Sequence, residues 1–323
     1  MSVGRSRSGK TGRSSYSHPL LRNRELYPNV IQAGPVMAGA VTTSVASLVL
    51  RFNWTLVYQV LDTAGMTFFV ATTGAAVVGA RLKAVGCSVL TRSIASTSAD
   101  RPLDRVLSDI ENSARIIIFW GHALTLRRFM ISAHRSNMTG ADYVYIFFYP
   151  YEYIISQFGN VTWQNDDEDD LVKICCFCPF MCKITQNSNA PSLDSLSRLR
   201  RTARCFANAS HRSSRDQQRL LDQFVARSQR DYNYTFAKND WPFPAVLSLY
   251  ASVSILRTTL DGLRKDELSK LSGSAVLASR MVNRTFETGG SGTYTFDHAG
   301  ERLINFDVRQ LNLSTGTFEA VLR

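Results

Sequence analysis

The sequence predicts an α/β fold in which helices cover both faces of a parallel sheet. Between residues 35 and 149, segments with helical spacing of apolar residues alternate with short apolar runs, and only short loops separate them. The β-branched run at 115–120 is apolar at nearly every position, which is typical of a strand buried on both faces of a sheet. We therefore expect a doubly wound, parallel-sheet lobe in this half of the chain.

The predicted elements of this lobe follow one another closely. Pro35 suits the first turn of a helix, and apolar residues recur at helical spacing from there to residue 51. The remaining elements alternate in type and are, in order, strand 55–61, helix 69–85, strand 87–90, helix 103–113, strand 115–120, helix 124–132 and strand 143–149.

The second half of the chain is less regular. An acidic run, a cysteine cluster and a polar stretch extend from residue 150 to residue 215. Three helices are predicted after them, at 215–230, 244–260 and 274–285. Alternating residues at 292–296 and 302–311 then predict a hairpin, which a turn containing Asp and Gly closes at 297–300.

The basic residues do not form a nucleic-acid-binding pattern. The formal net charge is +11, and much of the excess lies in the first 24 residues and at 198–230. Aromatic residues are not interleaved with these charges as they are in single-strand-binding proteins, so no nucleic-acid partner is expected.

Residues 1–33 are polar, basic and without periodicity, which predicts a disordered basic tail. A match to the phosphate-binding loop at residues 4–11 lacks the strand and helix that must flank such a loop.

No group of residues indicates catalysis, a metal ion or a cofactor. The sequence contains no G-x-S-x-G or H-E-x-x-H motif, and its five histidines are scattered. Cys175, Cys176, Cys178 and Cys182 lack the paired spacing of a zinc site, and we expect them on an apolar helix face or in disulfides. Catalytic residues are therefore not expected, and the chain is not expected to be an enzyme.

Asparagines in the glycosylation pattern Asn-x-Ser/Thr are more frequent than chance. Random placement of these residue types would give roughly three such sites. The seven predicted acceptors are Asn53, Asn137, Asn160, Asn208, Asn233, Asn283 and Asn312. Their excess indicates passage through the secretory pathway, although neither a signal peptide nor a run long enough for a transmembrane helix is expected in this chain.

Several segments match, in order along the chain, the pattern of one known family. Residues 51–57 resemble the helix-to-strand entry into one lobe of that family, and residues 115–121, 142–148 and 244–251 resemble later segments. Met281-Val-Asn-Arg-Thr-Phe286, followed by Asp297-His-Ala-Gly-Glu-Arg302, is similar to the family's most diagnostic pattern. On these segments the chain resembles the extracellular ligand-binding region of receptor guanylate cyclases and natriuretic peptide receptors, truncated at its amino end.

The resemblance implies a type I periplasmic-binding-protein-like fold with two doubly wound parallel-sheet lobes. A disordered tail would occupy residues 1–33, and the membrane-proximal lobe would comprise residues 34–150 and 292–323. Residues 151–291 would form part of the distal lobe, which would be incomplete. Two cysteines that pair in the natriuretic receptors are replaced here by Thr67 and Trp120.

The resemblance also implies a function. The chain would be the ligand-binding module of a receptor on the extracellular side of the plasma membrane, a glycoprotein that signals by a ligand-induced rearrangement of lobes or of a homodimer. The full-length parent could carry a guanylate cyclase domain, which is absent here. By resemblance, Phe68 and Phe69 would contact a peptide or small-molecule ligand. The alternatives are a receptor lobe of the same fold without a cyclase, of the clearance or amino-acid-receptor type, or a truncated product without function.

Overall fold

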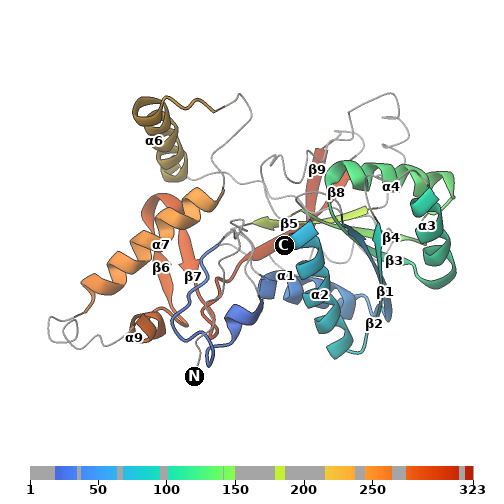
Figure 1. Ribbon diagram of the computed structural model, residues 1–323, viewed down its shortest axis with the longest axis horizontal. Helices are drawn as coiled ribbons and strands as arrows, with labels where there is room; N and C mark the ends of the chain where they lie inside the picture. The colour runs from blue at the N-terminus through green and yellow to red at the C-terminus, as the bar shows by residue number, and fades with distance from the viewer. Residues whose placement is uncertain are drawn as a thin grey trace, which may run out of the picture.

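The computed structural model describes residues 19–34, 38–63, 68–94, 101–140, 142–149, 179–185, 215–236, 244–263, 274–312 and 317–322. Figure 1 shows two bodies that lie side by side. We call the one built around a seven-stranded sheet the sheet body. The other, the small body, consists of helices and a two-stranded sheet.

The sheet body contains the alternating helices and strands that the sequence predicts. Its parallel part consists of α1 (Ala38–Arg51), β1 (Leu56–Asp62), α2 (Phe68–Ala84), β2 (Ser88–Ile94), α3 (Arg101–Ser113), β3 (Ile116–Trp120), α4 (Ala123–Arg135) and β4 (Val144–Tyr149). The predicted α/β class with a parallel sheet is confirmed, and most bounds differ from the predicted ones by a few residues.

The strands of this sheet lie in the order β2-β1-β3-β4-β5-β8-β9, and the first five are parallel. From β1 the chain moves to β2 at the edge, then crosses back past β1 to β3, so the winding reverses between β1 and β3. In Figure 1, α1 and α2 lie on one side of the sheet and α3 and α4 on the other. Helices on both faces explain why β3 is buried at all five positions.

Aromatic rings fill the layer between β3, β4 and α4. Phe129 of α4 lies 5.5 Å from Phe119 of β3, measured between ring centroids, and 6.1 Å from Tyr145 of β4. Phe119 also contacts Phe147, at 6.0 Å. Tilted and edge-on arrangements of this kind are favourable for aromatic rings, so this layer fixes α4 on the sheet.

An antiparallel edge completes the sheet. β5 (Pro179–Thr185) pairs with β8 (Asn305–Asn312), which pairs in turn with β9 (Thr317–Leu322). Cys182 belongs to β5, so the first of the two predicted alternatives, an apolar helix face, is wrong for this cysteine. Cys175, Cys176 and Cys178 lie outside the described residues.

The small body contains α6 (Arg215–Tyr232), α7 (Pro244–Asp261), α9 (Ser274–Ser279), the 3-10 turn η4 (Gly289–Ser291), β6 (Thr285–Glu287) and β7 (Thr293–Thr295). Its core joins one face of α7 to the two strands. The residues buried in this core are Ala251, Ile255, Met281, Phe286, Tyr294 and Phe296.

Two predictions for this region are wrong. The helix predicted at 274–285 ends at Ser279, because a turn follows and Thr285 already belongs to β6. The predicted hairpin does not form, because β7 pairs with β6 and β8 pairs with β5 and β9. Only its closing end remains. The predicted turn at 297–300 is present, with the N–H of Gly300 donating to the carbonyl oxygen of Asp297, and an isolated bridge joins Phe296 to Arg302. Residues 293–296 thus pack in the small body, and the chain reaches the sheet body after residue 302.

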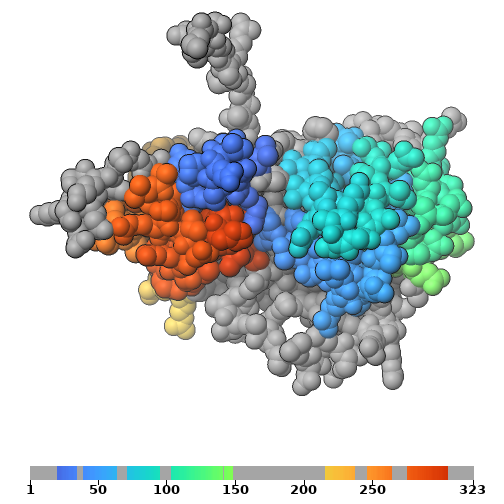
Figure 2. All heavy atoms as spheres, turned by 90° about the horizontal axis from the view of Figure 1, so that it is seen from below, coloured from blue at the N-terminus to red at the C-terminus, as the bar shows by residue number. Residues whose placement is uncertain are grey.

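Part of the predicted basic tail is packed against this crossover. The short 3-10 helix η1 (Pro19–Arg22) begins the segment, and Gln32 pairs with Glu301. Figure 2 shows this segment, in dark blue, lying against the orange and red residues of the small body. Among the helices that the structure describes, none is sufficiently long and apolar to cross a bilayer.

Candidate functional site

The carboxyl ends of β1 and β3 form the candidate site. The connections leaving these two neighbouring strands run to opposite faces of the sheet, because α2 follows β1 and α4 follows β3. Such a reversal leaves a crevice outside the strand ends, and ligands of open α/β sheets bind there. Asp62 ends β1, whereas Gly121 and His122 follow β3.

These residues approach one another closely. Asp62 is completely buried, and a β-carbon at Gly121 would overlap the side chain of Asp62. The backbone N–H of His122 donates a long hydrogen bond, 3.5 Å, to Oδ2 of Asp62. Glycine at 121 therefore permits the two strand ends to lie in contact at this edge.

His122 also begins α4. It is the N-cap, and its Nδ1 accepts a hydrogen bond of 3.2 Å from the N–H of Leu124. A capping side chain satisfies one of the free amide groups at a helix start. The half-buried imidazole is thereby fixed at the edge where a ligand would lie.

Thr63 holds the neighbouring strand end in place. Both its N–H and its Oγ1 donate to the carbonyl oxygen of Ile94, at 2.8 and 3.0 Å. Ile94 ends β2, so these bonds tie the ends of β1 and β2 together at the same edge.

A buried polar network positions α2 on the sheet beneath the site. The indole Nε1 of Trp120 donates to Oε1 of Gln59 at 2.8 Å, and Nε2 of Gln59 donates to the carbonyl oxygen of Ala75 at 3.2 Å. Gly74 faces the Trp120 ring, and a β-carbon there would lie 2.7 Å from it. Hydrogen bonds and close packing thus link α2 to β1 and β3.

Phe68 and Phe69 are the first two residues of α2, and α2 follows the carboxyl end of β1. The structure therefore brings their backbone to the candidate edge. Their side chains lie outside the described residues, so their contact with a ligand stays a prediction.

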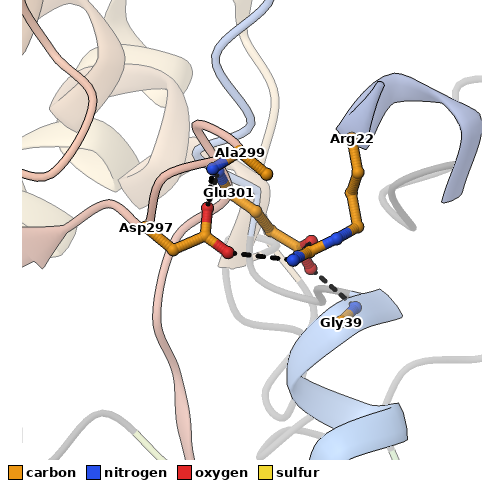
Figure 3. A network of polar contacts seen from close by, with 5 residues as sticks. All are labelled: Arg22, Gly39, Asp297, Ala299 and Glu301. Atoms are coloured by element: carbon orange, nitrogen blue, oxygen red, sulfur yellow. Dashed lines mark hydrogen bonds and ion pairs between the residues drawn. The ribbon is translucent and has the colours of Figure 1, made fainter. Parts of the chain in front are cut away.

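A second polar cluster joins the amino-terminal segment, α1 and the crossover from the small body (Figure 3). The Glu301 carboxylate forms an ion pair with Arg22 and accepts a 2.7 Å hydrogen bond from the N–H of Gly39, in the first turn of α1. Asp297 accepts from Arg22 at 3.1 Å. Burial opposes the charge of Arg22, but the hydrogen bond and charge of Glu301, with those of Asp297, raise its pKa above the usual value. We call this cluster the Glu301 junction.

Arg302 follows this junction and is almost fully buried. Its guanidinium lies over the ring of Tyr294, 3.4 Å from the centroid. Burial lowers the pKa of Arg302 to about 10. The group is thus charged at neutral pH and is stabilised by a cation–π contact.

The described residues contain no group of three or more His, Cys, Asp or Glu side chains that suits a metal ion. Cys87 is the cysteine whose surroundings are described; it is buried and unpaired, and burial raises the pKa of its thiol. A raised pKa leaves little of the reactive thiolate.

Comparison with protein families shows to which family this chain belongs. A family model described as the receptor family ligand binding region matches residues 14–314. The chain belongs to this family. The match is to a ligand-binding region and not to a catalytic domain.

Curated relatives of this receptor ligand-binding region carry one name. Atrial natriuretic peptide receptor 3 of Rattus norvegicus is 27% identical over 225 residues, which are 69% of this chain and 36% of the relative. The Bos taurus protein is 29% identical over 226 residues, with the same shares. The predicted relationship to natriuretic peptide receptors is confirmed, and the chain spans about a third of the length of these relatives.

Among solved structures, the region is similar to an ABC transporter substrate-binding protein from Desulfitobacterium hafniense in complex with Leu. The TM-score is 0.44 at 14% identity, and the match covers 88% of this chain and 65% of that chain.

Sequence reasoning missed several of the residues that shape this receptor region. Asp62 and Gly121 could have been found from their place at the ends of adjacent strands, where ligands of parallel sheets bind. Glu301 gave no such signal, since its partners Arg22 and Gly39 lie more than 260 residues away in the sequence.

Proposed function

We propose that this chain is the ligand-binding module of a cell-surface receptor and that it binds a peptide at the carboxyl ends of β1 and β3. The observation that carries the proposal is the family match over residues 14–314. The winding reversal at this edge supports the location, because ligands of open α/β sheets bind at such a reversal. Phe68 and Phe69 would provide aromatic contacts, and His122 a polar one.

Signalling would rest on a shift between conformations and not on chemistry. The sheet body and the small body meet at the crossover that contains the Glu301 junction. A ligand that binds one arrangement of the bodies more tightly increases its population. In an intact receptor, this shift would change the geometry of a homodimer at the cell surface. Guanylate cyclase activity, where the parent has it, would reside in another domain.

The test is binding of fluorescently labelled atrial natriuretic peptide to the purified chain, measured by fluorescence anisotropy. Gly121→Ala is expected to weaken binding at least about tenfold, a loss of about 1.4 kcal/mol, because the added methyl group displaces Asp62. Gly140→Ala is the matched control, since a β-carbon at Gly140 meets nothing within 4 Å. It should bind like the original chain.

Circular dichroism establishes that each variant is folded. A folded chain that does not bind the peptide contradicts the proposed ligand class. Equal affinities of the Gly121→Ala and Gly140→Ala variants contradict the proposed site.

A further inference from the structure

Four asparagines share an unusual backbone conformation. Asn53, Asn137, Asn233 and Asn283 have φ between 51° and 57°, and no other non-glycine residue in the described part of the chain has a positive φ. Each follows a helix by one to four residues. Asparagine is the residue that most often replaces glycine in the left-handed conformation that ends a helix. Asn53, Asn137 and Asn233 therefore end helices α1, α4 and α6, and Asn283 lies in the turn between α9 and β6.

The same four asparagines begin a glycosylation pattern. Threonine stands two positions after each of them, at Thr55, Thr139, Thr235 and Thr285. A left-handed helix end favours asparagine but requires no hydroxyl group two residues later. The helix ends therefore account for the asparagines alone. The hydroxyl groups of Thr139, Thr235 and Thr285 also have local hydrogen-bond partners, in His134, Gln229 and Thr295.

All four asparagines are also exposed to solvent. A left-handed residue turns the chain away from the helix axis, so each acceptor stands at a bend on the surface and not within a helix or strand. A bulky glycan can be accommodated there without displacing packed side chains.

Two of the acceptors occupy a defined place relative to the candidate site. Asn53 lies three residues before β1 begins at Leu56, and Asn137 lies in the connection from α4 to β4. In a parallel sheet, such helix-to-strand connections lie at the amino ends of the strands. Asp62 and His122 lie at the opposite, carboxyl ends.

We propose that Asn53, Asn137, Asn233 and Asn283 are N-glycan attachment sites, and that glycans at Asn53 and Asn137 cover the amino edge of the sheet and leave the ligand edge free. In the reaction, Nδ2 of asparagine forms a bond to C1 of a sugar. The bond from C1 to the diphosphate of a lipid-linked oligosaccharide breaks, the lipid diphosphate leaves with the electron pair, and the amide loses a proton to the solvent.

Occupancy is measured on the full chain, secreted from cultured animal cells behind a fused, cleavable leader. Enzymatic release of N-glycans in water labelled with ¹⁸O converts each occupied asparagine to labelled aspartate, which mass spectrometry locates. We expect label at all four positions. Thr55→Ala and Thr139→Ala should each abolish label at their own site alone, while Thr55→Ser and Thr139→Ser retain it.

Secretion itself is not required for the test. A chain that is retained inside the cells is translated instead into isolated microsomes and analysed in the same way. Absence of label at the four asparagines, in the secreted or in the microsomal chain, overturns the assignment.

The position of the glycans has its own test, which rests on the proposed function. The double variant Thr55→Ala/Thr139→Ala, which lacks both amino-edge glycans, should bind labelled atrial natriuretic peptide with an unchanged dissociation constant. A changed dissociation constant overturns the placement of these glycans away from the ligand edge. Because occupancy is measured without peptide, failure of the proposed ligand class leaves the occupancy result intact.

Discussion

Asn137 ends α4 in a backbone conformation that most side chains tolerate poorly, with φ of 57°. The residue is exposed, so its replacement changes backbone energy more than packing. Asn137→Ala is expected to lower the free energy of unfolding by about 1 kcal/mol. Alanine keeps the β-carbon that crowds the following carbonyl oxygen but lacks the polar side chain through which asparagine compensates by local hydrogen bonding. Asn137→Gly should leave stability nearly unchanged, because glycine adopts this conformation readily.

Urea denaturation of the unglycosylated chain, produced in bacteria, measures both values. The comparison separates the structural role of the asparagine from its role as an acceptor, since both variants lose the acceptor. Equal stability of the two variants would show that the left-handed conformation is not what this position requires.

Helix α2 is held on the sheet by the contact of Gly74 with Trp120. Alanine would favour the helix by up to about 1 kcal/mol in isolation. A β-carbon at Gly74 would nevertheless lie 2.7 Å from the indole ring, which the hydrogen bond to Gln59 holds in place. Gly74→Ala is therefore expected to destabilise the protein by about 1–3 kcal/mol, the range typical of overpacked cores.

Gly79→Ala on the same helix provides the control for Gly74→Ala in urea denaturation. Its β-carbon would lie 2.9 Å from the terminal amide nitrogen of Gln59 and 3.8 Å from Val89, so one terminal atom must shift and not an aromatic ring. The loss of stability should be smaller than for Gly74→Ala. A stability gain at Gly74 would mean that helix propensity outweighs the packing of α2 on Trp120.

The elements that the sequence predicted well are those with a local signal. The spacing of apolar residues predicted α1 to α4 and β1 to β4. Each of these elements buries one face, so its apolar residues recur at a regular spacing along the sequence. The pairing of β7 with β6 was missed, because a turn rich in Asp and Gly fits a hairpin between residues 296 and 302 equally well. Strand partners depend on the packing of the whole chain, as the pairing of β8 with β5 illustrates.

The candidate site was predictable only in part, for the same reason. The resemblance placed Phe68 and Phe69 at the start of α2, and the structure places this helix start after β1. Asp62, Gly121 and His122 become neighbours only once β1 and β3 pair, with Leu61 opposite Trp120. No spacing of residues within the sequence predicts that pairing.

At the scale of the whole molecule, the Glu301 junction connects segments that the sequence keeps far apart. Glu301 is buried and binds both Arg22 and the first turn of α1, so it ties the crossover from the small body to the sheet body. Glu301→Gln keeps the size of the side chain but removes the charge that Arg22 faces. We expect the free energy of unfolding to fall by about 1.5–3 kcal/mol, the usual contribution of a hydrogen bond to a charged group.

Asp109→Asn provides the matched control, because Asp109 forms a 3.2 Å ion pair with Arg92 in which both side chains are more than half exposed. Exposed pairs contribute about 0–1 kcal/mol, so this variant should unfold nearly like the original chain.

Urea denaturation, followed at the same time by tryptophan fluorescence and far-ultraviolet circular dichroism, measures both variants. Trp54 and Trp120 belong to the sheet body, whereas circular dichroism reports on the helices of both bodies. A fluorescence transition separated from the circular dichroism transition in Glu301→Gln would therefore indicate that the bodies unfold independently. Equal, small effects of the two substitutions would mean that the Glu301 junction does not couple the bodies, and the proposed transmission of ligand binding through it would have to be abandoned.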